Sequence, residues 1–302
     1  MATLYTHQSS NVAKTWLLMA FFFAGVILLG WFISLYLGDA NILYAAIIFA
    51  LVMNVGSYWF SDTLVIKMTG AKPVDKNEHL ELWRIVENLS ITAGLPMPKL
   101  YIVNDPAPNA FATGRNPEHA AVAVTTGLLS ILDRTELEGV LAHELSHVGN
   151  RDMLVSTVAV VLAGFVAIVA DIFLRMSMFG GGGDRDNRLG TIVLILGIIG
   201  IILAPIAAQL IQLAISRKRE YLADASGALL TRYPEGLASA LEKISRYSRP
   251  MQKANHATAH LFIADPFGAE GKKSIGQRIG GLFQTHPPAA DRIRILRDMN
   301  VE

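Results

Sequence analysis

The chain has 302 residues, of which 52% are hydrophobic and only 17% are charged, and it contains no cysteine. Soluble proteins usually carry about a quarter charged residues, so this excess of apolar residues requires a lipid environment or an unusually large core. A formal net charge of +1, without a basic run interleaved with aromatic residues, predicts no nucleic-acid partner. The lack of cysteine excludes disulfides and thiolate ligands, so any metal must be bound by histidines and carboxylates.

Four apolar runs are long enough to cross a bilayer, which takes about 20 helical residues. They cover residues 16–37, 42–60, 153–170 and 189–215. A single such run could be a buried helix of a soluble protein, but four together favour a membrane protein. The first run could also be a signal peptide, although it is longer than usual and residues 36–40 form a poor cleavage site. We therefore expect four transmembrane helices arranged as two hairpins.

Lysines and arginines near the ends of these runs predict the orientation of the chain. The turn between the first two runs has none, whereas three lysines follow the second run and Arg-Lys-Arg at 217–219 follows the fourth. Arginines at 175, 185 and 188 count against this bias. We expect transmembrane hairpins at residues 1–60 and 153–215. The segments 61–152 and 216–302 would then form one domain on the cytoplasmic side.

Local patterns predict several elements of this domain. Apolar periodicity indicates a helix over residues 77–93 with Gly94 as its stop. Short β-prone runs at 99–103 and 120–126 predict two strands. Thr135 and Glu138 fit a capping box at the start of a further helix.

That helix carries the sequence His143-Glu144-Leu145-Ser146-His147, an H-E-x-x-H pattern. Positions i and i+4 share one helix face about 6 Å apart, so two imidazoles can bind the same zinc ion. Glu144 can reach a water molecule at that ion without being a ligand. The alternative is that the two histidines are ordinary residues of an amphipathic helix.

A catalytic zinc site needs a third protein ligand, and Glu220 is the candidate. His147 lies six residues before the third apolar run and Glu220 lies five residues after the fourth. If the helices continue past the membrane, two antiparallel spans bring these two residues together. Asp224, four residues later, could accept the second N–H of a ligating histidine. The alternatives are a glutamate paired with Arg217 or Lys218, and a solvated aspartate.

The H-E-x-x-H sequence followed by Glu220-x-x-x-Asp224 resembles the M48 group of gluzincin metallopeptidases. The four apolar runs around these motifs are similar to its bacterial HtpX branch, and the resemblance covers nearly the whole chain. It implies an α-helical membrane protein with a mainly α, zincin-like α+β catalytic domain that carries a small sheet. It also implies one zinc ion per chain, with His143, His147 and Glu220 as ligands and Glu144 as the catalytic residue.

The resemblance further implies a zinc-dependent endopeptidase in the bacterial inner membrane, with its active site at the cytoplasmic face. Its role would be stress response and protein quality control. Its partners would be the lipid bilayer and misfolded or unfolded membrane proteins as substrates.

Two other segments match the family. Residues Asn109, Ala110, Phe111 and Ala112 correspond to an edge strand that pairs with extended substrates in such zincins, although a plain loop-to-strand segment is the alternative. The resemblance also suggests that His286, just before two prolines that suit a helix start, approaches the active site and stabilises an oxyanion. A simple loop histidine is the alternative there.

Two rival functions have weaker support. A membrane scaffold with a structural zinc ion does not require Glu144, which is present. A metal transporter needs ionisable residues inside its spans, and only Asp171 qualifies. His256 and His260 could be additional metal ligands, but we interpret them as plain loop residues.

Overall fold

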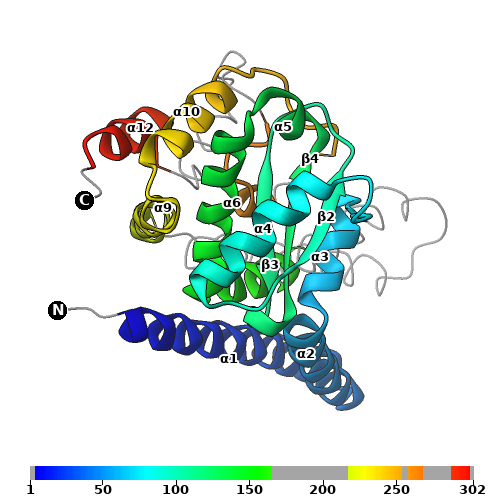
Figure 1. Ribbon diagram of the computed structural model, residues 1–302. Helices are drawn as coiled ribbons and strands as arrows, with labels where there is room; N and C mark the ends of the chain where they lie inside the picture. The colour runs from blue at the N-terminus through cyan, green and yellow to red at the C-terminus, as the bar shows by residue number, and fades with distance from the viewer. Residues whose placement is uncertain (1–3, 163, 165–216, 254–257, 268–286, 300–302) are drawn as a thin grey trace.

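The computed structural model describes residues 4–162, 164, 217–253, 258–267 and 287–299, and this part is mainly helical with one four-stranded sheet (Figure 1). The expected fourth span at 189–215, residues 163 and 165–170 of the third, His256 and His286 lie outside the described residues. The prediction of four spans and of a second hairpin therefore stays a prediction.

The first two helices form a hairpin along one side of the protein (Figure 1). They are α1 (Leu4–Leu37) and α2 (Asn41–Trp59). Gly38 lies in the turn between them with a φ of 69°, a value that glycine adopts without strain. A Cβ added at Gly30 of α1 would lie 2.2 Å from the Cβ of Ala46 in α2. The small residue therefore lets the two helices pack closely, as in many membrane hairpins.

Most of the apolar surface of this hairpin is exposed. Only 28% of the most apolar stretch of α1 and 17% of that of α2 is buried. Trp31, Leu35, Ile48 and Val52 are among the large apolar side chains that remain uncovered. Soluble proteins rarely expose continuous apolar surfaces of this kind. Within the described residues, α1 and α2 are the two helices long and apolar enough to cross a membrane.

The sheet is mixed, with strand order β1-β2-β4-β3. The strands are β1 (Lys72–Pro73), β2 (Lys99–Val103), β3 (Ala110–Gly114) and β4 (Ala120–Thr125). β2 and β4 are parallel, the other pairs are antiparallel, and β3 lies at one edge. The expected strand at 99–103 is confirmed. The strand expected at 120–126 ends one residue earlier, because the Thr125 hydroxyl accepts the N–H of Leu128 and caps α5 (Thr126–Ile131).

Helices cover both faces of the sheet, because successive strand residues point to opposite faces. One face packs against α4 (Leu80–Ala93) and α6 (Arg134–Gly149). The other face packs against α3 (Ser61–Thr69) and against Val160 of the helix that follows α6. Phe111 of β3 is fully buried in this second layer.

Two helix starts differ from expectation. α4 begins at Leu80 instead of residue 77, because the Asp75 carboxylate accepts the N–H of Asn77 and holds the preceding residues in a turn. Its predicted stop at Gly94 is confirmed, with a φ of 65°. The N-cap of α6 lies two residues before the expected one at Thr135, since Asp133 and Glu136 form the actual capping box through reciprocal bonds of 3.0 and 2.9 Å.

α6 does not continue straight into the next apolar helix, so the condition of a continuous helix on which the pairing of His147 with Glu220 was argued is not met here. It ends at Gly149, the following Asn150 is its C-cap, and Arg151 has a φ of 57°. A separate helix then covers Asp152–Leu162. Its Val155 and Val158 are fully buried and pack against α1. The start of the expected third span therefore packs inside the protein.

Three C-terminal helices complete the described part. They are α9 (Arg217–Thr231), α10 (Pro234–Ser245) and α12 (Ala289–Arg297). α12 starts directly after Pro288, as the two prolines predict. Figure 1 shows α9 beside α6, with α10 and α12 nearby on the side of the domain away from the α1–α2 hairpin.

Candidate metal centre

The candidate metal centre lies where α9 packs against α6. His143 and His147 are one turn apart on α6, and Glu220 is in the first turn of α9. Gly227 of α9 allows a close approach, because a Cβ added there would lie 3.0 Å from the backbone nitrogen of His143. The helix break after α6 does not disturb this pairing, since both histidines precede it.

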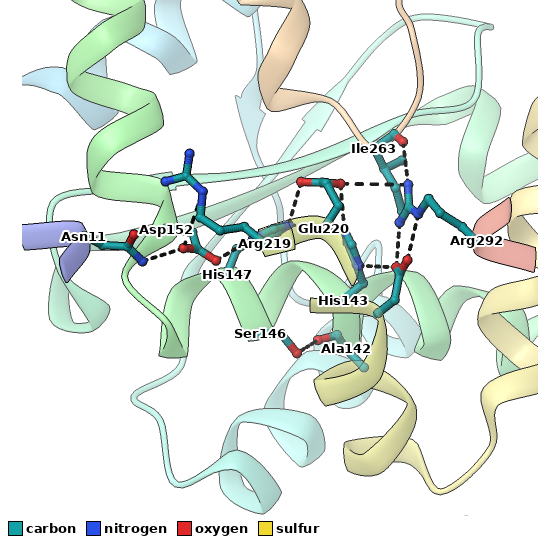
Figure 2. A network of polar contacts seen from close by, with 11 residues as sticks. Asn11, Ala142, His143, Ser146, His147, Asp152, Arg219, Glu220, Ile263 and Arg292 are labelled. Carbon is teal, nitrogen blue, oxygen red and sulfur yellow. Dashed lines mark hydrogen bonds and ion pairs between the residues drawn. The ribbon is translucent and has the colours of Figure 1, made fainter. Parts of the chain in front are cut away.

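The three expected ligands converge (Figure 2). The Nε2 atoms of His143 and His147 are 3.2 Å apart. Glu220 places one carboxylate oxygen 3.9 Å from His143 Nε2 and the other 3.6 Å from His147 Nε2. One ligand atom from each residue lies within 4.8 Å of the others. Two nitrogens about 2.0–2.1 Å from a shared tetrahedral ion are roughly 3.3 Å apart, so the residues fit a zinc-sized ion.

Each histidine has a carboxylate next to its Nδ1, the ring nitrogen that does not face the other ligands. Asp224 Oδ1 is 2.9 Å from His143 Nδ1, and Asp152 Oδ2 is 3.3 Å from His147 Nδ1. Accepting the Nδ1 proton fixes the tautomer and leaves Nε2 for a metal. The structure thus brings the predicted Asp224 to its expected place and adds Asp152.

Burial and the neighbouring carboxylates shift the pKa values of the two histidines in opposite directions. Burial lowers the pKa of His143, although the bond to Asp224 partly offsets this effect. Burial also lowers the pKa of His147, but Asp152 and Glu220 outweigh it and raise that pKa to about 9. Without a metal, His147 therefore holds a proton at neutral pH, in the position that a cation would take.

Glu144 is almost fully buried beside this group. Burial raises the pKa of its carboxyl, the negative charge of Glu220 raises it further, and the result is about 7. The positive charges of His147 and Arg292, and a hydrogen bond from the backbone of Ala112 in β3, lower this pKa and partly offset the rise. A carboxyl with a pKa near neutrality suits proton transfer in both directions.

Arg292 of α12 joins the site from the C-terminal part of the chain (Figure 2). Its side chain is only 2% exposed and donates to Asp224 at 2.8 and 2.7 Å. It also donates to the carbonyl of Ile263 at 3.3 Å and lies 3.9 Å from Glu220. Burial raises the pKa of Asp224, but Arg292 and His143 outweigh that effect and lower it to about 2. The carboxylate of Asp224 therefore stays ionised.

The segment expected to bind substrate lies at the sheet edge, as the resemblance implied, but part of it already has partners. The N–H of Ile263 donates to the Ala110 carbonyl at 2.9 Å. The Asn109 side chain donates to the Ala264 carbonyl at 3.0 Å and accepts the Ala264 N–H at 3.1 Å. The side chain of Asn109 and the carbonyl of Ala110 therefore bind the chain's own backbone. The part of β3 near the metal centre is Ala112, beside Glu144.

A model of peptidase family M48 matches residues 76–300 of the chain. The chain belongs to peptidase family M48. It is 45% identical over 305 residues to a "Protease HtpX homolog" of Caldanaerobacter subterraneus subsp. tengcongensis, with 99% of each chain covered. It is 50% identical over 292 residues to a "Protease HtpX homolog" of Pyrococcus furiosus, with 96% of each chain covered.

One solved structure, "Crystal Structure of S. mikatae Ste24p", matches with a TM-score of 0.49 and 16% sequence identity. The match covers 98% of this chain and 67% of that chain. Membership in family M48, the buried ligand group and the exposed apolar hairpin together indicate a membrane-associated metalloprotease.

The M48 pattern pointed to five residues that the structure places in one cluster. They are His143, Glu144, His147, Glu220 and Asp224. Asp152 and Arg292 were missed, because an aspartate at a helix start and an arginine on an amphipathic helix resemble ordinary surface residues. His260 is buried with Nε2 3.4 Å from the Ser156 carbonyl, and it is not a member of the metal group.

Proposed function

We propose that this M48 protein is a zinc-dependent endopeptidase with His143, His147 and Glu220 as metal ligands. The observation that carries the proposal is the 3.2 Å separation of the two Nε2 atoms, with a Glu220 oxygen near each. Carboxylates hold the opposite nitrogen of each ring, which is the usual arrangement for histidines that bind a metal. Of the divalent metals, zinc suits two imidazoles and one carboxylate in a protease of this type.

Glu144 is the proposed catalytic residue. A zinc ion at this site would lower the pKa of bound water towards 7 and polarise the scissile carbonyl. Glu144 takes the proton from the attacking water and passes it to the leaving amine. Its raised pKa supports this role, because the same carboxyl must accept and then release a proton near neutral pH. His286, outside the described residues, is the proposed oxyanion-stabilising group.

We propose misfolded membrane proteins as substrates, cleaved at the cytoplasmic face. The support is the contact between α1 and the metal centre, where Asn11 of α1 touches the same Asp152 that touches His147. The hairpin of α1 and α2 exposes apolar surface along most of its length. A site so close to one end of this hairpin is within reach of loops and unfolded segments at the bilayer surface. The part of the β3 edge around Ala112, beyond the Ala110 carbonyl that Ile263 already occupies, is the proposed pairing surface for an extended peptide.

The first test compares the wild type with Glu144→Gln, each purified in detergent, stripped with a chelator and given zinc. An unfolded fluorogenic protein serves as substrate, and bound zinc is counted in parallel. We expect about one zinc ion in both proteins and turnover by the wild type alone. Turnover by Glu144→Gln would rule out Glu144 as the catalytic residue. A wild type that binds no zinc would rule out the proposed function.

The substrate proposal needs its own test. One target polypeptide is presented either as a soluble unfolded protein or anchored in the same vesicles as the enzyme. We expect faster cleavage of the anchored form. Equal rates at equal local concentration would count against a preference for membrane proteins.

A further inference from the structure

The N-terminal helix α1 contacts the metal centre through one polar side chain. Asn11 lies in α1, 139 residues before Asn150 and 141 before Asp152 in the sequence. Its Nδ2 donates to Asp152 Oδ1 at 2.6 Å and to the Asn150 carbonyl at 3.1 Å. Figure 2 shows Asn11, Asp152 and His147 in one row leading to the ligand group.

We infer that α1 is part of the metal centre, with Asn11 as a positioning residue that acts on His147 through Asp152. This inference rests on the proposed function, because it concerns the same metal ligands. It assigns to the N-terminal helix a role that a simple membrane anchor does not have.

The two oxygens of Asp152 have different partners, and this division fixes the carboxylate. Oδ1 accepts from Asn11, and Oδ2 lies 3.3 Å from His147 Nδ1. Arg219 is also near Oδ1, but its Nε is 3.9 Å away, beyond hydrogen-bond distance. Of these two contacts to Oδ1, only the one from Asn11 is a hydrogen bond, so it sets the orientation of the Asp152 carboxylate towards His147.

The helix break explains why this contact is needed. Asn150 follows the last residue of α6, where helix carbonyls lack partners within the helix. The same Asn11 amide binds this carbonyl and the carboxylate just after the break. One side chain from α1 thus joins the end of α6, which carries His147, to the start of the helix Asp152–Leu162.

Packing holds Asn11 in place. Leu18, Met19 and Phe22 of α1 are buried against Leu154 and the neighbouring residues of the helix Asp152–Leu162. Asn11 itself is only 4% exposed. A buried amide that loses its acceptors is costly, so α1 and this helix keep their register. Displacement of α1 would release Asp152 and leave His147 less ordered.

The test measures zinc affinity by competition with a chelator, using the full-length protein in detergent. Asn11→Leu removes the donor at similar volume, and Asn11→Ala provides a second variant that makes no new contact. Lys14→Ala is the matched control, because Lys14 is exposed on the same helix. Loss of a group that orients a ligating histidine typically weakens metal binding 10- to 100-fold. We expect at least a tenfold loss for both Asn11 variants and no change for Lys14→Ala.

The same Asn11 substitutions in an Asp152→Ala background separate positioning from general destabilisation. If Asn11 acts through Asp152, its removal causes no further loss of zinc affinity there. An equal loss in both backgrounds, or unchanged affinity in both Asn11 variants, would overturn the inference. Such a result leaves the proposed function intact when the wild type binds zinc and cleaves. A wild type that binds no zinc would instead remove the proposed function, and this inference with it.

Discussion

Arg292 of α12 and Asp224 of α9 form a bidentate ion pair, with 2.8 Å between Nε and Oδ2 and 2.7 Å between Nη2 and Oδ1. Both side chains are at least 98% buried. The pair holds Asp224 with its Oδ1 2.9 Å from His143 Nδ1. The C-terminal helix is therefore connected to His143, a proposed metal ligand, through one carboxylate.

Replacement of Arg292 should destabilise the fold. Arg292→Met leaves a buried carboxylate without its cation, and such losses cost about 3–5 kcal/mol. Arg292→Lys should recover only part of this stability, because an ammonium cannot make the paired bonds of a guanidinium. Urea unfolding in detergent measures the effect. Arg294→Met, on the exposed side of the same helix, is the control, and an equal stability of the two Met variants would contradict the prediction.

Zinc affinity should rise with pH. The pKa of His147 is raised to about 9 in the metal-free protein, so a proton occupies this ligand below that pH and must leave when zinc binds. Each pH unit below 9 should therefore weaken zinc binding about tenfold for this one proton. Chelator competition at pH 6, 7 and 8 checks the slope.

The partner of His147 offers a control for this pH dependence. Asp152→Asn removes a carboxylate that raises the pKa of His147. The rise in affinity with pH should then end at a lower pH than in the wild type. A zinc affinity of the wild type that does not change between pH 6 and 8 would contradict this prediction.

Gly227 should control the spacing of α9 and α6. In Gly227→Ala the new Cβ would meet the backbone nitrogen of His143 at 3.0 Å and its Cα at 3.2 Å. The helices must separate by a few tenths of an ångström, which moves Glu220 away from the two histidines. We expect roughly tenfold weaker zinc binding, although alanine alone favours a helix by about 1 kcal/mol. Ser226→Ala on the same helix should leave zinc affinity unchanged, and an unaffected Gly227→Ala would show that the spacing tolerates a methyl group.

Replacement of Asn109 should lower the stability of the fold rather than weaken substrate binding. Its side chain makes two bonds to the backbone of Ala264, so Asn109→Ala leaves the N–H and the carbonyl of this half-buried residue without these partners. The expected loss is about 1–3 kcal/mol in the free energy of unfolding. The KM for a peptide should be unchanged in the folded variant, and the exposed Asn104→Ala serves as control. A higher KM at unchanged stability would instead favour direct contact between Asn109 and substrate.

The elements that are determined by residues adjacent in the sequence were predictable. The helix stop at Gly94, the strand at 99–103 and the helix after Pro288 follow from local backbone preferences. The facing of His143 and His147 follows from the 3.6-residue period of one helix. Errors arose where two local patterns competed, as at Asp133, which forms the cap that the sequence suggested for Thr135.

By itself, the sequence determined the ligand types, the H-E-x-x-H spacing, the apolar runs and the family, because each is a pattern along the chain. Only the tertiary structure decided that Asn11, Asp152 and Arg292 lie around the same candidate metal centre. These residues come from segments far apart in the chain, and no local periodicity relates them. Their positions depend on how α1 packs, on the break after α6 and on the burial of α12, which are properties of the whole packed chain.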